Sequence, residues 1–358
     1  MQRRWLEAQA DLVEQVLWQH RAPGRVTGGR VTPTTVLFQV VPAPGVRWSR
    51  LKGLAEDLAL ALGVPGVRIQ REGPVVQVEV PRPDPQVVRF EPLMAQVRRA
   101  FPRYPAYTAL LGLAADGAPL LLRLTSPQVT HVLIAGTTGS GKTSLARTML
   151  LSLVLTHRPG QLALVIVDPK GRAFLPFRDL PHVRAFAAGE AAEGLACLAE
   201  VVAVMERRSR EGVQTPRLLV VIDELADLLQ QGGRELGEAL TRLAQRGRET
   251  GIHLLACTQK PTAALLGGAL TANFPARLVG RVVTAEDARV AAGIGGTGAE
   301  RLAGRGDFLA VVGGAVTRFQ AAYIAPEEIR ARLQASERQR EKTDPSGSPS
   351  DAFKRRGE

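Results

Sequence analysis

The chain opens with apolar residues at helical spacing, and this pattern then gives way to short strand-like runs. An amphipathic helix is predicted over Met1–His20, where apolar side chains recur every three or four residues. These side chains are Trp5, Ala8, Leu12 and Val16. Gly24–Arg30 is rich in glycine and arginine, interrupts the helical pattern and predicts a hinge.

A second region combines strand-like runs with one helix. The helix is predicted at about Leu51–Leu62, because Gly63 and Pro65 end the helical pattern there. Runs rich in β-branched residues predict strands at Thr35–Val41, Val67–Ile69 and Val75–Val80. The proline-rich segment Pro81–Pro85 then leads to a predicted helix over Pro92–Phe101 and to a further pair of strand-like runs. This is the pattern of a small α/β unit.

From Thr130 the chain alternates apolar strands with helices, which predicts a doubly wound, mainly parallel sheet covered on both faces. The predicted strands are His131–Ala135, Leu162–Val167, Leu218–Ile222, Ile252–Thr258 and Ala276–Val283. The predicted helices are Lys142–Thr156, Ala191–Arg210, Glu235–Arg248 and Ala285–Ala292. A closing hairpin is expected from Asp307–Val312 and Ala315–Tyr323, on either side of Gly313 and Gly314.

The composition indicates that the chain can bury one large or two medium hydrophobic cores, since 45% of its 358 residues are apolar. Its apolar stretches are shorter than the roughly 18 residues of a membrane span, so we expect a cytoplasmic protein with no membrane partner or signal peptide. The two cysteines, Cys197 and Cys257, lie in apolar runs, which disfavours a disulfide framework or a zinc site. The net charge of +12 slightly favours a polyanionic partner.

A P-loop joins the first strand of the parallel region to its first helix, in the segment HVLIAGTTGSGKTS at His131–Ser144. Glycines let successive backbone N–H groups surround a phosphate, the lysine reaches the β- and γ-phosphates, and the following threonine hydroxyl ligates Mg²⁺. The residues expected to bind nucleotide are Gly136, Thr137, Thr138, Gly139, Ser140, Gly141, Lys142, Thr143 and Ser144. We therefore expect ATP and Mg²⁺ as cofactors, with Thr143 as a metal ligand and Lys142 acting in catalysis.

Two adjacent carboxylates follow the apolar run Leu218–Ile222. They emerge at the carboxyl end of a central strand, which is where α/β sheets bind their ligands. Asp223 is suited to hold Mg²⁺, and Glu224 to orient and deprotonate an attacking water. A glutamate beside the metal-binding aspartate favours water as the nucleophile, so hydrolysis is expected rather than kinase chemistry.

Two other strands end in polar residues that are expected at the same edge of the sheet. Leu162–Val167 is followed by Asp168–Lys170, whose tips can face the phosphates or simply cap a turn. Ile252–Thr258 is followed by Gln259, which is placed to sense the γ-phosphate and so to convert hydrolysis into movement.

Taken in this order, the segments of the chain resemble those of the FtsK/SpoIIIE family of double-stranded DNA translocases. The matching segments are HVLIAGTTGSGKTS, VIVDPKG, MERR, LLVVIDELADLL, RLAQRGRETGIHLLACTQKP, NFPARL and GRGDFL. Residues 126–324 carry the close resemblance, and Val31–Val80 looks like the α subdomain that precedes the motor in that family. The resemblance implies a RecA-like P-loop NTPase fold preceded by a small α/β subdomain.

The resemblance also implies a homo-hexameric ring that hydrolyses ATP at its subunit interfaces and moves double-stranded DNA through a central pore. An arginine from the neighbouring subunit would complete each site. We place it at Arg277 in the segment NFPARL, with Arg246 and Arg248 as alternatives. Candidate basic contacts to DNA phosphates are Arg172, Arg178, Arg281 and Arg301.

We expect four parts: an amino-terminal helix in residues 1–25, the small subdomain in 26–125, the motor in 126–334 and a disordered tail in 335–358. The amino-terminal membrane domain and the carboxyl-terminal winged helix of cell-division members have no counterpart, which favours a stand-alone motor or one recruited by a loading protein. Two alternatives stay open. One is a type VII-like protein-secretion ATPase, and the other is an ATP-gated DNA ring or clamp that does not translocate.

Overall fold

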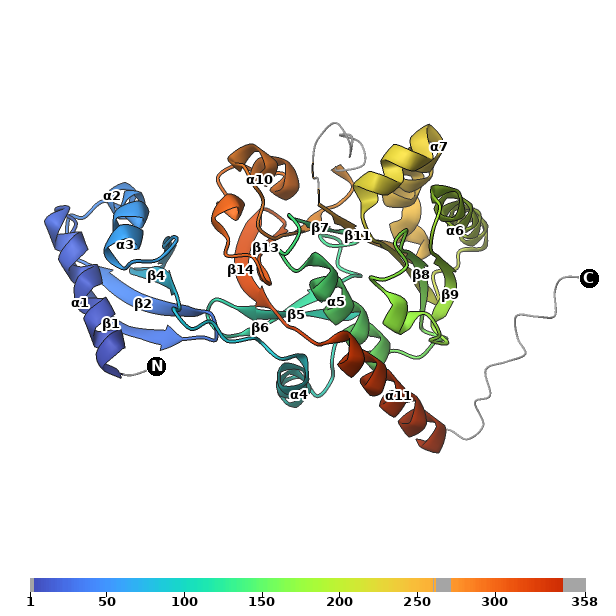
Figure 1. Ribbon diagram of the computed structural model, residues 1–358, viewed down its shortest axis with the longest axis horizontal. Helices are drawn as coiled ribbons and strands as arrows, with labels where there is room; N and C mark the ends of the chain where they lie inside the picture. The colour runs from blue at the N-terminus through green and yellow to red at the C-terminus, as the bar shows by residue number, and fades with distance from the viewer. Residues whose placement is uncertain (1–2, 260, 262–271, 344–358) are drawn as a thin grey trace, which may run out of the picture.

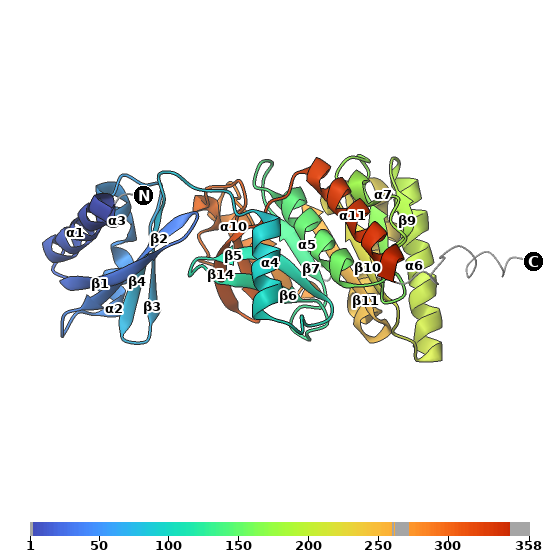
Figure 2. The same cartoon turned by 90° about the horizontal axis from the view of Figure 1, so that it is seen from below.

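Two separate sheets organise the chain, as Figure 1 shows. The computed structural model describes residues 3–259, 261 and 272–343. The first sheet has four strands in the order β1-β2-β4-β3, and the second has ten in the order β6-β5-β14-β13-β12-β7-β11-β10-β8-β9. The small sheet and its helices lie at one end of an elongated molecule, and the large sheet forms the rest (Figures 1 and 2).

The small domain is an antiparallel sheet covered by helices on one face. Its elements are α1 (Arg3–Gln19), β1 (Gly24–Val31), β2 (Thr35–Pro42), α2 (Trp48–Gly53), α3 (Ala55–Ala61), β3 (Arg68–Glu72) and β4 (Val75–Pro81). Alternate residues of β2 and β4 point toward the helices, because side chains alternate along a strand with a period of two. They meet Val13, Val16 and Leu17 of α1 in a buried core.

Two predictions for this domain were wrong. Gly24–Arg30 is not a hinge but part of β1, which pairs antiparallel with β2 through a bulge between Val26 and Gly28. Most residues of this edge strand are exposed, so its sequence lacks the apolar alternation that marks a half-buried strand. The helix predicted over Leu51–Leu62 is divided at Leu54, whose backbone (φ −87°, ψ 8°) leaves the helical range.

The large sheet consists of a parallel part and an antiparallel part. Strands β12, β7, β11, β10, β8 and β9 are parallel to one another, and β13, β14, β5 and β6 extend the sheet through antiparallel pairs. The strands are β5 (Thr108–Ala114), β6 (Pro119–Arg123), β7 (Val132–Ala135), β8 (Leu162–Val167), β9 (Val183–Ala187), β10 (Arg217–Ile222), β11 (Ile252–Thr258), β12 (Ala276–Val279), β13 (Asp307–Val312) and β14 (Ala315–Ala321). The predicted α/β fold and its mainly parallel sheet are thereby confirmed.

Helices cover both faces of this sheet. They are α4 (Phe90–Ala100), α5 (Lys142–Thr156), α6 (Ala191–Glu211), α7 (Leu225–Arg246), α10 (Ala285–Ala292) and α11 (Pro326–Thr343), with short 3₁₀ turns at Leu175–Phe177, Gly247–Thr250 and Ala299–Arg301. On one face Leu219 and Val221 of β10 pack in the core that contains α4, α5 and α11. On the other face Val220 and Ile222 pack in the core that contains α6 and α7. The strand is apolar throughout because both of its faces are buried.

Two strands of the large sheet and one of the helices that cover it differ clearly from the sequence prediction. Strand β9 was not predicted, since only its last residue is fully buried. Strand β12 ends at Val279 instead of residue 283, because the chain turns there and the Arg281 carbonyl accepts a hydrogen bond from Thr137 N–H. Helix α7 begins ten residues earlier than predicted, and its kink at Gly233 (φ 60°, ψ −150°) explains why the sequence pattern appeared to start later.

The two sheets do not divide the chain at residue 125. Strands β5 and β6 pair within the large sheet, and Phe90, Met94 and Val97 of α4 belong to its core. We therefore place the boundary between β4 and α4. The predicted disordered tail also begins too early, since α11 continues to Thr343 and packs through Ile329 and Leu333. The rest of that predicted tail lies outside the described residues.

Few contacts join the domains. Arg30 donates to the Asp116 carbonyl, and Arg301 lies 3.4 Å from Glu56. A cleft of about 1050 Å³ separates β3, α2 and α3 from the segment 294–303 and from Arg318. Among the described residues, no helix is long and apolar enough to cross a membrane.

Two buried histidines lie beside each other at the edge of the sheet where β7 and β11 begin. The His131 Nδ1 accepts a hydrogen bond from Leu254 N–H at 3.0 Å, and the His253 Nδ1 lies 2.9 Å from the Thr130 carbonyl oxygen. Burial lowers the pKa of His131 to about 3 and that of His253 to about 4. Both side chains therefore stay neutral in the folded protein at pH values where they are protonated in the unfolded chain.

We expect the folded state to lose stability as the pH falls below about 6.5, the pKa of a histidine in an unfolded chain. The unfolded chain takes up protons in the window from 6.5 down toward these lowered pKa values, and the folded chain does not. At pH 5 the loss is about 2 kcal/mol per histidine, measurable as a shift in the urea midpoint relative to pH 7.5. His131→Gln should remove part of this pH dependence. An equal dependence in the variant would contradict the assignment.

Candidate functional site

Four parallel strands bring the predicted site residues to one edge of the sheet. The registers pair Ile222 with Val167 and with Ala256, and Thr258 with Ala135, so β7, β8, β10 and β11 end close together. In space β11 lies between the strand that leads into the P-loop and the strand that leads into Asp223 and Glu224. The predicted convergence of the P-loop, the two carboxylates and Gln259 is confirmed.

The loop between β7 and α5 has the conformation of a phosphate cradle. Gly136 N–H donates to the Thr258 carbonyl (3.2 Å), and Ser140 N–H donates to the Thr137 carbonyl (3.1 Å). Gly136 (φ 151°) cannot carry a side chain without strain, because a Cβ there would lie 2.9 Å from Ser140 Oγ. The loop ends at Lys142, where the first turn of α5 presents backbone N–H groups that lack a helical partner and favour an anion.

Lys142 lies over this loop and is 8% exposed. Its Nζ donates to the Thr137 carbonyl at 3.0 Å. Burial lowers the pKa of Lys142, and the charges of Glu224 and Asp223 oppose that shift. The ammonium is thus held among carboxylates and backbone dipoles instead of water, where its attraction to an anionic ligand is strong.

Asp223 and Glu224 follow directly after β10. Burial, helped by the charges of Asp168 and Glu224, raises the pKa of Asp223 to about 6. The backbone of Glu224 lies in the left-handed region (φ 53°), which costs energy for a residue other than glycine. Such strain is characteristic of residues held in place for chemistry.

Gln259 connects the P-loop to Glu224. Its backbone N–H donates to Glu224 Oε1 at 3.0 Å, and its Oε1 accepts a hydrogen bond from Thr138 Oγ1 at 2.7 Å. Gln259 is therefore in hydrogen-bond contact with both the P-loop and the carboxylate of Glu224. The sequence predicted a sensor here, and the structure adds that its partner is Thr138.

Asp168, at the end of β8, is fully buried. Its Oδ2 accepts a hydrogen bond from Phe174 N–H at 3.0 Å. Arg147 of α5 donates to the Ala173 and Arg172 carbonyls in the same loop, and its charge acts on Asp168 and Asp223. Arg147 belongs to none of the motifs predicted from the sequence, although it lies one helical turn after Thr143 and so on the same face of α5.

A turn at residues 303–306 also contributes to the cradle. Arg305 N–H donates to the Gly139 carbonyl (3.1 Å), and Gly306 N–H donates to the Ser140 carbonyl (2.8 Å). The sequence suggested this segment only as part of a family match, since its contacts reach residues more than 160 positions away.

The proposed arginines lie in different surroundings. Arg277 is half-buried and donates to the carbonyls of Phe274, Val290 and Ala291 in its own chain. The alternatives Arg246 and Arg248 are exposed. The candidate DNA contacts Arg172, Arg178, Arg281 and Arg301 are exposed as well, although Arg178 lies over the Phe186 ring and Arg301 pairs with Glu56 and Glu300.

The edge fits a nucleotide with a divalent cation. The side chains of Thr143 and Asp223 carry oxygen atoms, the type of ligand that Mg²⁺ prefers. Among the described residues, the buried atoms Ser140 Oγ, Thr258 Oγ1 and Asp168 Oδ1 lack a hydrogen-bond partner. Unpartnered buried polar atoms are costly, so their gathering here indicates a site shaped for a polar ligand.

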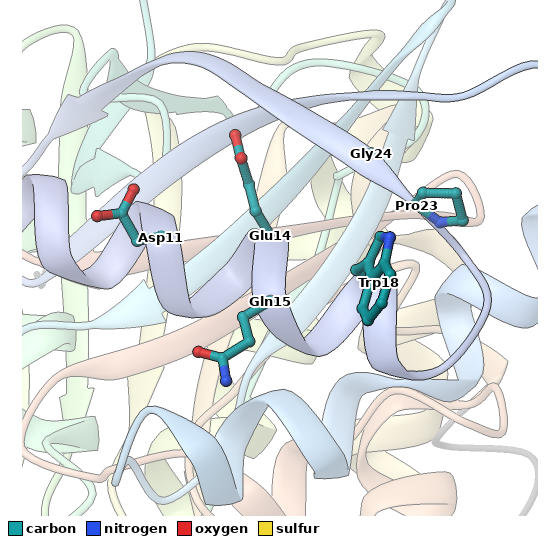
Figure 3. A pocket seen from close by; sticks show the side chains of 6 residues that line it. All are labelled: Asp11, Glu14, Gln15, Trp18, Pro23 and Gly24. Carbon is teal, nitrogen blue, oxygen red and sulfur yellow. The ribbon is translucent and has the colours of Figure 1, made fainter.

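A second hollow, of about 390 Å³, lies on the small domain between α1 and the start of β1 (Figure 3). Its lining includes Asp11, Glu14 and the exposed ring of Trp18. This hollow is unsuited to a phosphate, because its lining contains two carboxylates, which repel an anion, and no basic group.

Comparison with known proteins agrees with the geometry of the site. The model of the FtsK/SpoIIIE family matches residues 94–211 and 209–263, and the model of the FtsK alpha domain matches residues 1–82. Among solved structures, the pCW3 conjugation coupling protein TcpA, a monomer with ATPγS, superposes with a TM-score of 0.62 at 18% identity over 93% of this chain and 99% of that one. The cytoplasmic domain of the type VII secretion ATPase EccC of Thermomonospora curvata gives 0.56 at 28% identity over 64% of this chain and 31% of that one. The fold is that of these P-loop ATPases.

Curated relatives match nearly the whole chain. DNA translocase FtsK of Sporosarcina ureae is 31% identical over 91% of this chain and 45% of that protein. DNA translocase SftA of Bacillus subtilis (strain 168) is 31% identical over 91% of this chain and 36% of that protein, and DNA translocase FtsK of Helicobacter pylori (strain ATCC 700392 / 26695) is 35% identical over 83% and 37%. The chain spans less than half the length of these relatives. The match to the alpha-domain model covers the small domain, and the match to the FtsK/SpoIIIE model covers the phosphate loop and the paired carboxylates. The chain therefore belongs to the FtsK/SpoIIIE family.

Proposed function

We propose that this protein is an ATPase that drives movement along double-stranded DNA. The observation that carries the proposal is the contact between Gln259, the P-loop residue Thr138 and the carboxylate of Glu224. It links the mouth of the nucleotide site to the residue that would activate water. The relatives that match nearly the whole chain are named DNA translocases, which supports double-stranded DNA as the partner.

The chemistry follows from the residues at the sheet edge. The N–H groups of the P-loop and the Lys142 ammonium would bind the phosphates, while Thr143 and Asp223 would hold Mg²⁺. Mg²⁺, when bound, neutralises charge on the phosphates. Glu224 would accept a proton from the attacking water, and Gln259 would respond to the loss of the γ-phosphate.

We further propose that the protein works as a homo-hexameric ring in the cytoplasm, with ATP at the subunit interfaces and a neighbour's arginine at each site. Such an arginine is worth roughly 10³–10⁵ in rate in other nucleotidases. Arg277 donates to three carbonyls of its own chain, so the exposed Arg246 and Arg248 become the stronger candidates. A protein that loads the ring onto DNA is a further proposed partner.

The secretion-ATPase alternative is not favoured. The EccC structure resembles 64% of this chain, whereas the translocase relatives match about 90% of it, small domain included. An ATP-gated DNA clamp would use the same ATP site but would not move along DNA. Movement along DNA must therefore be tested directly.

Two substitutions separate binding from turnover. Lys142→Ala should weaken binding of a fluorescent ATP analogue by about 10- to 100-fold, since a hydrogen bond to a charged group contributes roughly 1.5–3 kcal/mol. Glu224→Gln should bind the analogue normally yet release phosphate at least about 100-fold more slowly, because the general base is lost. Lys52→Ala, on the small domain, serves as the matched control. Normal turnover by Glu224→Gln would remove the catalytic assignment.

Linear duplex DNA should raise ATP hydrolysis several-fold, and added salt should reverse the effect because phosphate contacts release counterions. Phosphate release is measured beside displacement of a third strand from a triplex, with single-stranded DNA as the control. Stimulation without displacement would identify a clamp. A rate that no DNA changes would refute the proposed function.

The arginine that acts in trans can be found by mixing variants. Glu224→Gln subunits retain their arginine, so they should restore hydrolysis when mixed with subunits that lack only that arginine. We expect recovery with Arg246→Ala or Arg248→Ala and not with Arg277→Ala. Phosphate release is compared at equal total protein, with mixed rings verified by mass spectrometry. Recovery with Arg277→Ala would instead assign the trans role to that residue.

A further inference from the structure

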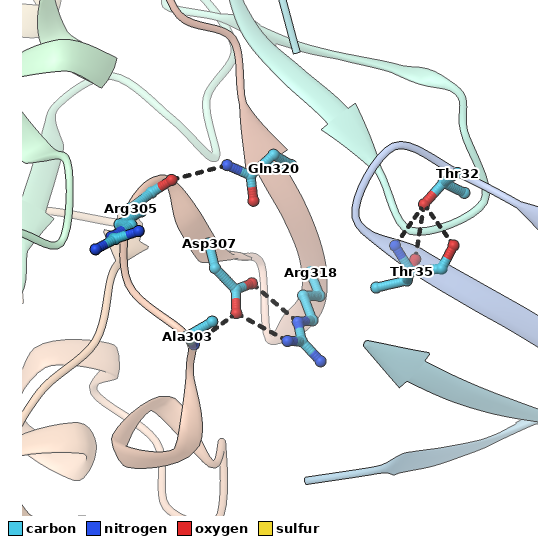
Figure 4. Close-up of polar contacts among 7 residues, drawn as sticks. All are labelled: Thr32, Thr35, Ala303, Arg305, Asp307, Arg318 and Gln320. Carbon is cyan, nitrogen blue, oxygen red and sulfur yellow. Dashed lines mark hydrogen bonds and ion pairs between the residues drawn. The ribbon is translucent and has the colours of Figure 1, made fainter. Parts of the chain in front are cut away.

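A buried ion pair lies behind the phosphate loop. Arg318 of β14 donates from Nε to Asp307 Oδ1 at 2.9 Å and from Nη2 to Asp307 Oδ2 at 2.8 Å (Figure 4). The side chains of Arg318 and Asp307 are 13% and 9% exposed. A bidentate pair of this kind is strong and geometrically specific. Among the hydrogen bonds and ion pairs of the described residues, none joins Asp307 or Arg318 to Lys142, Asp223 or Glu224.

Asp307 also holds the turn at residues 303–306 that precedes β13. Its Oδ2 accepts a hydrogen bond from Ala303 N–H at 2.9 Å, and its own N–H donates to the Gly304 carbonyl at 3.1 Å. From β14, Gln320 Nε2 donates to the Arg305 carbonyl at 2.9 Å, as Figure 4 shows. The turn is thus anchored at both ends by side chains of the hairpin.

The turn needs this anchoring because its backbone is unusual. Arg305 lies in the left-handed region (φ 50°), where a residue with a side chain is disfavoured, and Gly304 and Gly306 also have positive φ. Contacts elsewhere must compensate for such a conformation.

The anchored turn orients two peptide groups of the phosphate loop. Its N–H groups, from Arg305 and Gly306, donate to the carbonyls of Gly139 and Ser140. In a trans peptide the N–H points opposite to the C=O. Fixing the Ser140 carbonyl toward the turn therefore directs the Gly141 N–H away from it, toward the phosphate side of the loop. The fit is close, since a Cβ at Gly141 would lie 3.0 Å from Gly306 N.

We propose that Asp307 and Arg318 are positioning residues for nucleotide binding: they hold the turn at 303–306, which aims the Gly141 N–H of the phosphate loop at the phosphates of the ligand. The inference rests on the proposed function, because it requires that the loop bind a nucleotide. Loop amides bind the α- and β-phosphates. Loss of the pair should therefore weaken ATP and ADP alike, and leave the step catalysed by Glu224 largely intact.

The test compares Asp307→Asn with Gln320→Ala. Asp307→Asn removes the carboxylate that Arg318 hydrogen-bonds, whereas Gln320→Ala removes only the contact to the Arg305 carbonyl and keeps the ion pair. An unpaired buried charge is strongly destabilising, so Asp307→Asn can fail to fold. In that case Gln320→Ala still tests the inference. Glu286→Gln, which breaks an exposed ion pair with Arg289 on α10, is the matched control.

We expect the Kd of ATP and of ADP to rise about tenfold in Asp307→Asn and about threefold in Gln320→Ala, with kcat at saturating ATP changed less than twofold. Urea unfolding run alongside establishes that each variant is folded under the assay conditions, so lost stability alone would not change the Kd. Folded variants that bind both nucleotides like the unaltered protein would overturn the inference. Failure of the unaltered protein to bind either nucleotide would instead refute the proposed function.

Discussion

The whole site depends on the parallel hydrogen bonding of β7, β11, β10 and β8. Parallel strands end at the same edge, so one register brings together residues from positions 136 to 259 of the chain. Strand β10 is central to this arrangement, with β11 on one side and β8 on the other, and it is buried on both faces. A slip of one residue would turn its apolar side chains to the opposite faces and would misplace Asp223 and Glu224.

Charge burial is the cost of this arrangement. Lys142, Asp223, Glu224 and Asp168 gather at one edge of the sheet. Burial lowers the pKa of Lys142, and burial together with like charges raises the pKa of Asp223. The ammonium offsets part of the carboxylate repulsion, and the unpartnered polar atoms nearby remain for a ligand to satisfy. Binding of an anion together with a divalent cation is therefore more favourable here than at a site that is neutral and whose polar atoms are all hydrogen-bonded.

The phosphate loop is also held by hydrogen bonds to the segments around it. Three neighbours hold it: the β11 end through the Thr258 carbonyl, the segment after β12 through the Arg281 carbonyl, and the turn before β13 through Arg305 and Gly306. The antiparallel hairpin of β13 and β14 is thus more than an extension of the sheet. It places Asp307 and Arg318 where they brace that turn, and Arg318 also lines the cleft that faces the small domain.

Local sequence determined much of this protein. Strong apolar runs and glycine spacing were enough to predict β8, β11, α5 and α10 with their observed bounds, and the phosphate loop with its lysine, because these signals act over a few residues. Weaker local signals failed: β1 is an exposed edge strand, and Gly233 concealed the first turns of α7. Only the tertiary structure decided that β5 and β6 join the large sheet, that Gln259 contacts Thr138, that Arg277 bonds within its own chain and that Asp307 holds the turn that contacts the phosphate loop. These features depend on which elements pack against each other in three dimensions, and the spacing of residues along the sequence carries no information about that packing.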